Sequence, residues 1–356
     1  MERISLAIIG QGRSGRNIHG AFYKSEANKY VNVAYVVESD PARRALAAEE
    51  YEGAVILDDY TKLFGIEGID IVVNDTYSDT HYSISKDLLE HGFNVLVEKP
   101  MARTRYECDD LIRCANERGL ILAVFQQTFL APIYQNALKV IAEGKLGRVK
   151  QINISYNGLV RRWDWQTLQC RVAGSTYNTG PHPIGMALGF LDFDESADVA
   201  FSRLDTLVTS GDSDDYSKII ITAPGRCVVD IEMISTDAFP EMTVKIIGDR
   251  GTYRSTYTDY EMKYIVDGEN PERPVCRDFI TDEKGLPTYC SEQLITHEEK
   301  GRIEGDSFST ATENFYRMLH ATLKCDTPLT VTPEMAARII SVIEKVHADN
   351  PLPVRF

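Results

Sequence analysis

Several common signatures are missing from this chain of 356 residues. Its seven cysteines form no Cys-x-x-Cys pair, and no cluster of cysteine and histidine has the spacing of zinc ligands. We therefore expect no metal site, and we expect free thiols in a reducing cytoplasm. No stretch approaches the roughly 20 apolar residues of a membrane span, and the first apolar run is too short for a signal peptide. The sequence also lacks internal repeats and low-complexity segments.

Positive charge is scarce as well. Lys and Arg number 38 against 53 Asp and Glu, which gives a net charge of −15. Such an acidic chain disfavours nucleic acid and anionic membranes as partners. A negatively charged substrate would need a local basic patch, for which Arg161 and Arg162 are candidates. The hydrophobic content of 43% is typical of a globular protein, and a chain of this length predicts two domains.

A glycine-rich loop follows the first apolar run. Ile4 to Ile9 predicts a strand, and the next six residues have the form G-x-G-x-x-G and lead into a helix over residues 14–24. In a dinucleotide-binding fold, these glycines allow a tight turn, close approach of a pyrophosphate and close packing of helix on strand. A purely structural loop is the alternative. We expect a dinucleotide to be bound by Gly10, Gly12, Arg13, Ser14 and Gly15.

A second predicted strand, Val31 to Val37, ends at Glu38, about 20 residues beyond the glycines. A carboxylate at this position accepts hydrogen bonds from ribose hydroxyls and repels a 2′-phosphate. The sequence therefore favours NAD over NADP, with Asp40 as a competing candidate. Arg43 and Arg44 lie near enough along the chain to meet a 2′-phosphate, which leaves NADP as the alternative.

Strands and helices alternate over residues 1–125. Further strands are predicted at 54–57, 69–73, 95–97 and 120–125, and helices at 80–91 and from a capping box at Thr104 to Gly119. This alternation predicts an α/β domain with a doubly wound parallel sheet of the Rossmann type. Ligands bind at the carboxyl ends of such strands. Further cofactor contacts are therefore expected from Thr76, Tyr77, Ser78, His81 and Gln127.

The run from Phe93 to Pro100 places two ionisable residues directly after a buried strand. Pro100 removes a backbone donor and ends the strand, so Glu98 and Lys99 are expected at the ligand crevice. A surface ion pair at a solvated strand end is the alternative. His19 and His81 lie in helical segments, where packing or capping is the expected role.

Residues 126–356 have a different pattern. A helix at 132–143 is followed by strands at 149–156, 199–204, 218–222, 227–234, 243–247, 252–257 and 261–266, with a hairpin turn at 248–251. Strands without intervening helices predict an α+β domain with an open, mostly antiparallel sheet. Residues 267–305 are expected to be loop. Two closing helices, 308–323 and 333–348, could pack back on the first domain.

Two stretches of this second domain suggest chemistry. Arg161 to Trp165 holds both tryptophans of the chain, interleaved with charge, and such a stretch suits a polyhydroxylated ring. A core tryptophan pair beside surface charges is the alternative. His182 lies between two prolines in a glycine-rich stretch, 174–189, so its direction is fixed and an acid/base role is a hypothesis.

Together these residues resemble the Gfo/Idh/MocA oxidoreductases, the family of glucose–fructose oxidoreductase and inositol 2-dehydrogenase. The resemblance covers nearly the whole chain and rests on the glycine loop, Glu98-Lys99-Pro100, the turn at 144–147 and the Gly-x-His turn at 180–182. It implies an open-faced sheet domain, chemistry at a sugar or cyclitol carbon, and a homo-oligomer, dimer or tetramer, formed through that sheet. It also implies that Lys99 and His182 are catalytic.

One departure from the family concerns the partner of His182. The family commonly has an aspartate four residues before this histidine and an acidic residue three after it, and here these positions are Asn178 and Gly185. An amide can orient an imidazole but cannot stabilise imidazolium as a carboxylate does. We expect the amide oxygen of Asn178 to hold the ring N–H of His182, with Asp164 as another source of charge.

The sequence therefore predicts an NAD-dependent dehydrogenase that oxidises a hydroxyl carbon of a sugar, cyclitol or glycoside. One alternative is redox-neutral glycoside cleavage through a transient keto-sugar with recycled NAD. Another is a non-catalytic NAD-binding sensor, motivated by the missing aspartate. Substrate contacts are expected from Lys99, Arg162, Trp163, Trp165, Tyr177, Asn178 and His182.

Overall fold

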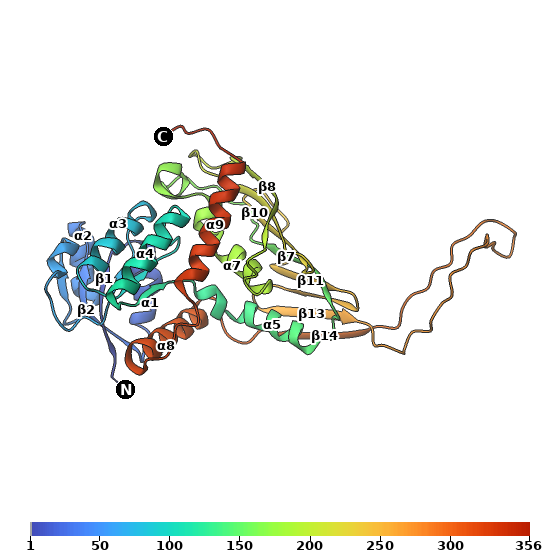
Figure 1. The fold of residues 1–356 in the computed structure, drawn as a ribbon, viewed down its shortest axis with the longest axis horizontal. Helices are drawn as coiled ribbons and strands as arrows, with labels where there is room; N and C mark the ends of the chain where they lie inside the picture. The colour runs from blue at the N-terminus through green and yellow to red at the C-terminus, as the bar shows by residue number, and fades with distance from the viewer. Residues whose placement is uncertain (1) are drawn as a thin grey trace.

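The computed structural model describes residues 2–356, which form two sheets with helices around and between them (Figure 1). The first sheet has six parallel strands in the order β3-β2-β1-β4-β5-β6. The strand order reverses between β1 and β4, where an open parallel sheet forms its ligand crevice. The predicted doubly wound sheet is confirmed. Its strands are β1 (Ile4–Ile9), β2 (Val31–Val37), β3 (Val55–Leu57), β4 (Ile71–Asn74), β5 (Val95–Val97) and β6 (Leu122–Val124).

Short and long helices connect these strands. The glycine loop opens a π-helical turn, Gly15–His19, that continues into α1 (Gly20–Tyr23). The helix α2 (Pro41–Glu50) follows β2, and α3 (His81–Glu90) and α4 (Arg105–Arg118) follow β4 and β5. The predicted capping box is present at the start of α4, where Thr104 Oγ1 accepts a hydrogen bond from the Glu107 N–H at 3.2 Å.

The second sheet has eight strands in the order β14-β13-β12-β11-β7-β10-β9-β8. Only β7 and β10 pair in parallel, and the other neighbours run antiparallel. The predicted second sheet is therefore confirmed. Its strands are β7 (Val149–Ser155), β8 (Asp198–Asp205), β9 (Tyr216–Thr222), β10 (Val228–Ile234), β11 (Val244–Gly248), β12 (Gly251–Ser255), β13 (Asp259–Tyr264) and β14 (His297–Arg302).

The strand β14 corrects one prediction. Residues 267–305 were expected to be loop throughout, but His297–Arg302 pairs along the whole length of β13. The remaining segment between β13 and β14 projects far from the rest of the chain (Figure 1). Charged residues dominate β14, so no alternation of apolar residues marks it as a strand.

Helices from the second half of the chain pack against both sheets. They are α5 (Pro132–Glu143), α6 (Ser175–Asn178), α7 (Pro181–Phe190), α8 (Ser309–Cys325) and α9 (Pro333–Asp349). The aromatic side chains Phe315 and Tyr316 of α8 are buried with Ile4, Leu6 and Ile8 of β1. A second core continues from the first sheet through α9 into the second sheet, and α9 lies between the two sheets (Figure 1). Of the helices formed by residues 2–356, none is both long and apolar enough to cross a bilayer.

Candidate functional site

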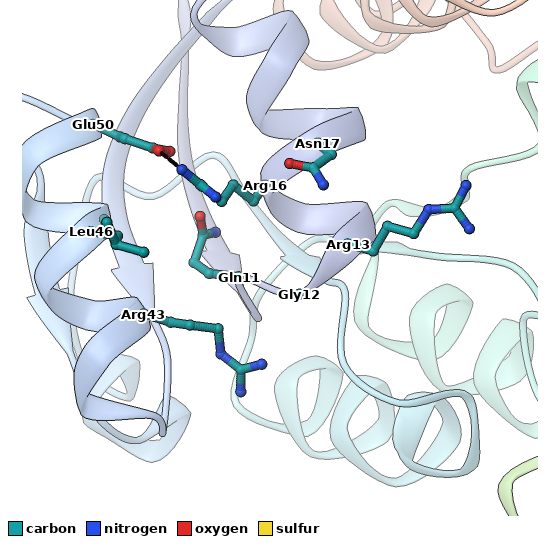
Figure 2. A pocket seen from close by; sticks show the side chains of 9 residues that line it. Gln11, Gly12, Arg13, Arg16, Asn17, Arg43, Leu46 and Glu50 are labelled. Carbon is teal, nitrogen blue, oxygen red and sulfur yellow. Dashed lines mark hydrogen bonds and ion pairs between the residues drawn. The ribbon is translucent and has the colours of Figure 1, made fainter. Parts of the chain in front are cut away.

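The glycine loop lies beside a hollow at the carboxyl end of β1. Gly10 has φ +98°, and a Cβ added there would lie 2.3 Å from the carbonyl oxygen of Asp75, so only glycine fits. A Cβ on Gly12 would meet no atom within 4 Å, so this face of the loop is open to a ligand. The adjoining cavity of about 260 Å³ lies between the loop and α2, with Gln11, Arg16, Arg43 and Glu50 among its lining residues (Figure 2).

Glu38 follows β2, is 4% exposed and is hydrogen-bonded to two residues that line this cavity, Gln11 and Arg43. Its carboxylate accepts hydrogen bonds from the Gln11 N–H at 2.8 Å, the Asp40 N–H at 2.8 Å and Arg43 Nη2 at 3.2 Å. Asp40, the competing candidate, instead caps α2 by accepting from the Arg43 N–H at 2.9 Å. Figure 2 shows the Arg43 side chain extending from α2 beside the loop, whereas the Arg13 side chain extends away from α2. Glu38 therefore holds the loop and a guanidinium at the same time.

Glu98 joins the strand end to the glycine loop. Its Oε1 accepts from Ser14 Oγ at 2.8 Å and lies 3.3 Å from His19 Nε2, and its Oε2 accepts from the Lys99 N–H at 2.8 Å. Burial alone would raise the pKa of Glu98, but the hydrogen bond with His19 and the charge of Lys99 outweigh it and lower the pKa to about 2. His19 also bonds Tyr316 OH at 2.6 Å, so a buried, ionised carboxylate links the loop to α8.

Asp75 is a residue of this region to which the sequence assigned no role. It follows β4 and is 7% exposed, and burial together with the charge of Glu98 raises its pKa well above the ordinary value. Its Oδ2 has no hydrogen-bond partner among residues 2–356, and a Cβ on Gly15 would lie 2.7 Å from that oxygen. Only its burial beside Glu98 marks this residue, and burial of this kind is invisible in the sequence.

Lys99 reaches from the first sheet to the second domain. Its Nζ donates to the backbone oxygen of Asn178 at 2.8 Å, at the end of α6. Burial lowers the pKa of Lys99, and the charge of Glu98 opposes this shift. His182 follows in the first turn of α7, and burial and the positive charge of Lys99 lower its pKa to about 3. The structure therefore brings Lys99 to the segment between α6 and α7 that leads into His182, although the two residues were predicted from separate stretches.

The partners of His182 and Asn178 differ from those predicted. His182 Nδ1 is hydrogen-bonded to Thr128 Oγ1, and Asn178 Oδ1 accepts from Gln166 Nε2 at 3.1 Å. The predicted hydrogen bond between Asn178 and His182 is therefore wrong, because each side chain has another partner. Asp164, the other predicted source of charge for His182, is instead paired with Arg162 Nη2 at 2.8 Å.

Aromatic residues of the second domain close over the first. The Trp165 ring meets the Tyr77 ring edge to face, with centroids 4.9 Å apart at 86°. Arg171 lies over the same tyrosine at 5.2 Å and pairs with Asp79 at 2.9 Å. Trp163 is 78% exposed, so the two tryptophans are not a buried core pair.

Three predicted ligand-binding residues are turned toward the protein. Tyr177 donates its hydroxyl to the backbone oxygen of Arg103 at 2.9 Å and stacks on His347. The ring nitrogens of His81 lie 2.7 Å from the Pro100 oxygen and 3.3 Å from the Thr76 oxygen. Thr76 Oγ1 donates to Asn74 at 2.8 Å. These contacts stabilise the walls of the crevice.

The described residues fit a dinucleotide. The Gly12 face is open, Arg43 Nε is buried without a partner, and Gln127 Oε1 after β6 is likewise buried and without a partner within residues 2–356. Polar atoms left in this state are costly unless a ligand or water satisfies them. Over the same residues, no three His, Cys, Asp or Glu side chains gather as a metal site.

Comparison with known proteins identifies the family. Residues 4–126 match the model of the Gfo/Idh/MocA family described as an oxidoreductase family with an NAD-binding Rossmann fold. Residues 139–348 match the C-terminal alpha/beta domain of the same family. The chain therefore belongs to the Gfo/Idh/MocA oxidoreductases, and its first domain is an NAD-binding Rossmann domain.

Individual relatives are distant. Inositol 2-dehydrogenase 2 of Saccharopolyspora erythraea is 25% identical over 279 residues, which cover 78% of this chain and 79% of the relative. The scyllo-inositol 2-dehydrogenase (NADP(+)) IolW of Bacillus subtilis is 24% identical over 190 residues, 53% of this chain and 52% of the relative. The crystal structure of GenD2 from gentamicin A biosynthesis, in complex with NAD, superposes with a TM-score of 0.75 at 21% identity and covers 98% of this chain and 95% of that chain.

Proposed function

We propose that this protein is an NAD-dependent dehydrogenase that oxidises a hydroxyl carbon of a sugar, cyclitol or glycoside. The observation that carries the proposal is that Lys99, beside the crevice of an NAD-binding domain, is hydrogen-bonded to Asn178 just ahead of His182, whose pKa is lowered by burial and by the charge of Lys99. The inositol dehydrogenases among the relatives support a polyol substrate.

In this proposal, NAD, when bound, would supply the acceptor for a hydride from the carbinol carbon. Lys99 donates a hydrogen bond to the reacting oxygen and stabilises negative charge on it. His182 takes the hydroxyl proton. A low pKa keeps this imidazole neutral and able to accept a proton, and the hydroxyl becomes strongly acidic as the hydride leaves. Arg162, Trp163 and Trp165 contact the rest of the substrate, and Asn178 positions Lys99 through its backbone oxygen.

The cofactor contacts of the proposal follow the crevice. The open face of Gly12 and the start of the following helix receive the pyrophosphate, and Glu38 accepts from the adenosine ribose, which favours NAD over NADP. Arg43 lies 3.2 Å from Glu38, so its charge is already partly compensated by that carboxylate. The remaining proposed contacts come from Gly10, Arg13, Ser14, Gly15, Tyr77, Ser78, Glu98, Lys99 and Gln127, whereas Thr76 and His81 are bound to other residues of the protein.

The test is a panel of sugars, cyclitols and glycosides with NAD, followed by NADH absorbance and by product chromatography. We expect NADH and a keto product in equal amounts with at least one cyclitol or sugar. Cleavage of a glycoside without net NADH would replace the proposal by the redox-neutral alternative. NAD binding without consumption of any compound would indicate a sensor.

Three wider predictions accompany this function. We propose a domain division between residues 125 and 126, which the end of the first matched segment at 126 supports. A homo-oligomer, dimer or tetramer, formed through the second sheet stays a prediction. Cytoplasmic location also stays a prediction.

A further inference from the structure

We propose that Thr128 is the positioning residue of His182, and that it accepts the Nδ1–H of the ring so that Nε2 faces the substrate as the base. Thr128 thereby takes the place that spacing along the sequence assigned to Asn178. The inference rests on the proposed function, because only a dehydrogenase that removes a hydroxyl proton needs Nε2 free.

The position of Thr128 is set by its surroundings. It lies in the short 3-10 helix Gln127–Leu130 directly after β6, is 7% exposed, and its Oγ1 is hydrogen-bonded to His182 Nδ1. The neighbouring Gln126 donates its side-chain amide to the Pro181 oxygen. Two hydrogen bonds therefore join residues 126–128 to the first turn of α7, one at the Pro181 oxygen and one at the His182 ring.

Gly185 allows this close approach. A Cβ at Gly185 would lie 3.2 Å from the Phe129 ring and 3.3 Å from Gln126 Nε2, tighter than ordinary packing. Gly185 stands where the family often has an acidic side chain. Its small size allows α7 to pack against the 3-10 helix. Tyr156 lies parallel to the His182 ring, with centroids 6.5 Å apart at 10°. The ring is therefore held at its Nδ1 edge and has an aromatic neighbour parallel to it.

A hydroxyl has different consequences from a carboxylate at this position. It can accept Nδ1–H from neutral histidine and continue to accept from imidazolium, so it keeps the same ring orientation throughout proton transfer. It carries no charge, so it does not favour imidazolium as an aspartate would. Burial and Lys99 lower the pKa of His182, in agreement with an uncharged partner.

The first test needs neither substrate nor NAD. Nitrogen NMR of protein with labelled histidine reports the tautomer of each ring, and His182→Gln assigns the signal of His182. We expect the wild type and Thr128→Ser to carry the proton on Nδ1, and Thr128→Val, which has the same shape without the hydroxyl, to show a mixture of tautomers. Equal tautomer populations in the wild type and Thr128→Val would overturn the inference, as would an equal change in Asn178→Ala.

The second test uses turnover. Thr128→Val should lower kcat by roughly 10–100-fold with little change in KM, and Thr128→Ser should restore most of it. Thr128→Asp should raise the pKa of His182 and move the acid limb of the activity profile to higher pH. If the wild type oxidises a polyol and Thr128→Val has the same kcat, only the inference about Thr128 is overturned. If the tautomer of His182 changes in Thr128→Val but the protein oxidises none of the compounds, only the proposed function is refuted.

Discussion

The two ends of the crevice are held together in different ways. At the cofactor end, buried carboxylates bind backbone N–H groups: Glu38 holds the glycine loop at Gln11, and Glu98 holds the strand end at Lys99. At the catalytic end, side chains from distant segments bind one another, as in the pairs Thr128–His182 and Gln166–Asn178. The first arrangement is constrained by backbone geometry and tolerates little change. The second can exchange one partner for another, which is how His182 is held without an aspartate at position 178.

The largest effect is expected at the catalytic end. Lys99→Ala should lower turnover roughly 10²–10⁴-fold and leave NAD affinity largely intact, because the Nζ contacts the second domain and, in our proposal, binds the reacting oxygen. Turnover and NAD binding by calorimetry are measured side by side. Lys86→Ala is the matched control, since Lys86 of α3 pairs with Asp110 of α4. Near-normal turnover in Lys99→Ala would remove this residue from the mechanism.

Substitutions of two glycines at the cofactor end distinguish steric effects on stability from effects on NAD binding. Gly10→Ala should destabilise the fold by about 1–3 kcal/mol or more, because its Cβ would overlap the Asp75 carbonyl and its φ is positive. Gly12→Ala should leave the thermal midpoint of the free protein unchanged and weaken NAD binding at least about tenfold. Differential scanning calorimetry with and without NAD makes the comparison. If both variants lost stability equally, the open face of Gly12 would not be a ligand surface.

The preference between NAD and NADP tests the role of the Glu38 carboxylate. The wild type should bind NAD more tightly than NADP, and Glu38→Gln should narrow the gap, because the charge that repels a 2′-phosphate is gone while an oxygen acceptor for Gln11 stays. Titration of both dinucleotides measures the ratio. Tighter binding of NADP by the wild type would show that Arg43, and not Glu38, decides the preference.

The smallest effect is expected where the second domain closes over Tyr77. Trp165→Ala should speed NAD dissociation about 2–13-fold, the factor that corresponds to an aromatic pair of 0.5–1.5 kcal/mol. Trp163→Ala is the matched control, because Trp163 is exposed and, within residues 2–356, its ring forms no aromatic pair with the first domain. Stopped-flow fluorescence measures both rates. Equal rates in the two variants would mean that the Trp165–Tyr77 contact does not retain the cofactor.

The glycine loop and several helix starts could be predicted from the sequence because their signals are local. The glycine loop, the Thr104 capping box and the Pro132 helix start each depend on residues within a few positions. The charged strand β14 lacked such a signal, since it is an exposed edge strand that pairs through its backbone. In the same way, the stretch around His182 has prolines and glycines typical of a turn, yet it forms the buried helix α7 with Pro181 in its first turn.

The partner of His182 could not be predicted, for two physical reasons. A separation of four residues brings side chains together only on a continuous helix, and α6 ends at Asn178 before α7 begins at Pro181. Thr128 is 54 residues away along the chain and meets His182 only because the 3-10 helix after β6 packs on α7. Neither the helix break nor the long-range contact has a signature in residue spacing.

The most direct test of the account follows the hydride itself. A cyclitol or sugar that the panel identifies is prepared with deuterium at its carbinol carbons and mixed with the enzyme and NAD for one turnover. The cofactor is then recovered, and its mass is measured by mass spectrometry. The account predicts one deuterium on the reduced nicotinamide in the wild type and none in Lys99→Ala with the cofactor still bound. Conversion of the substrate by the wild type without deuterium in the cofactor would contradict it.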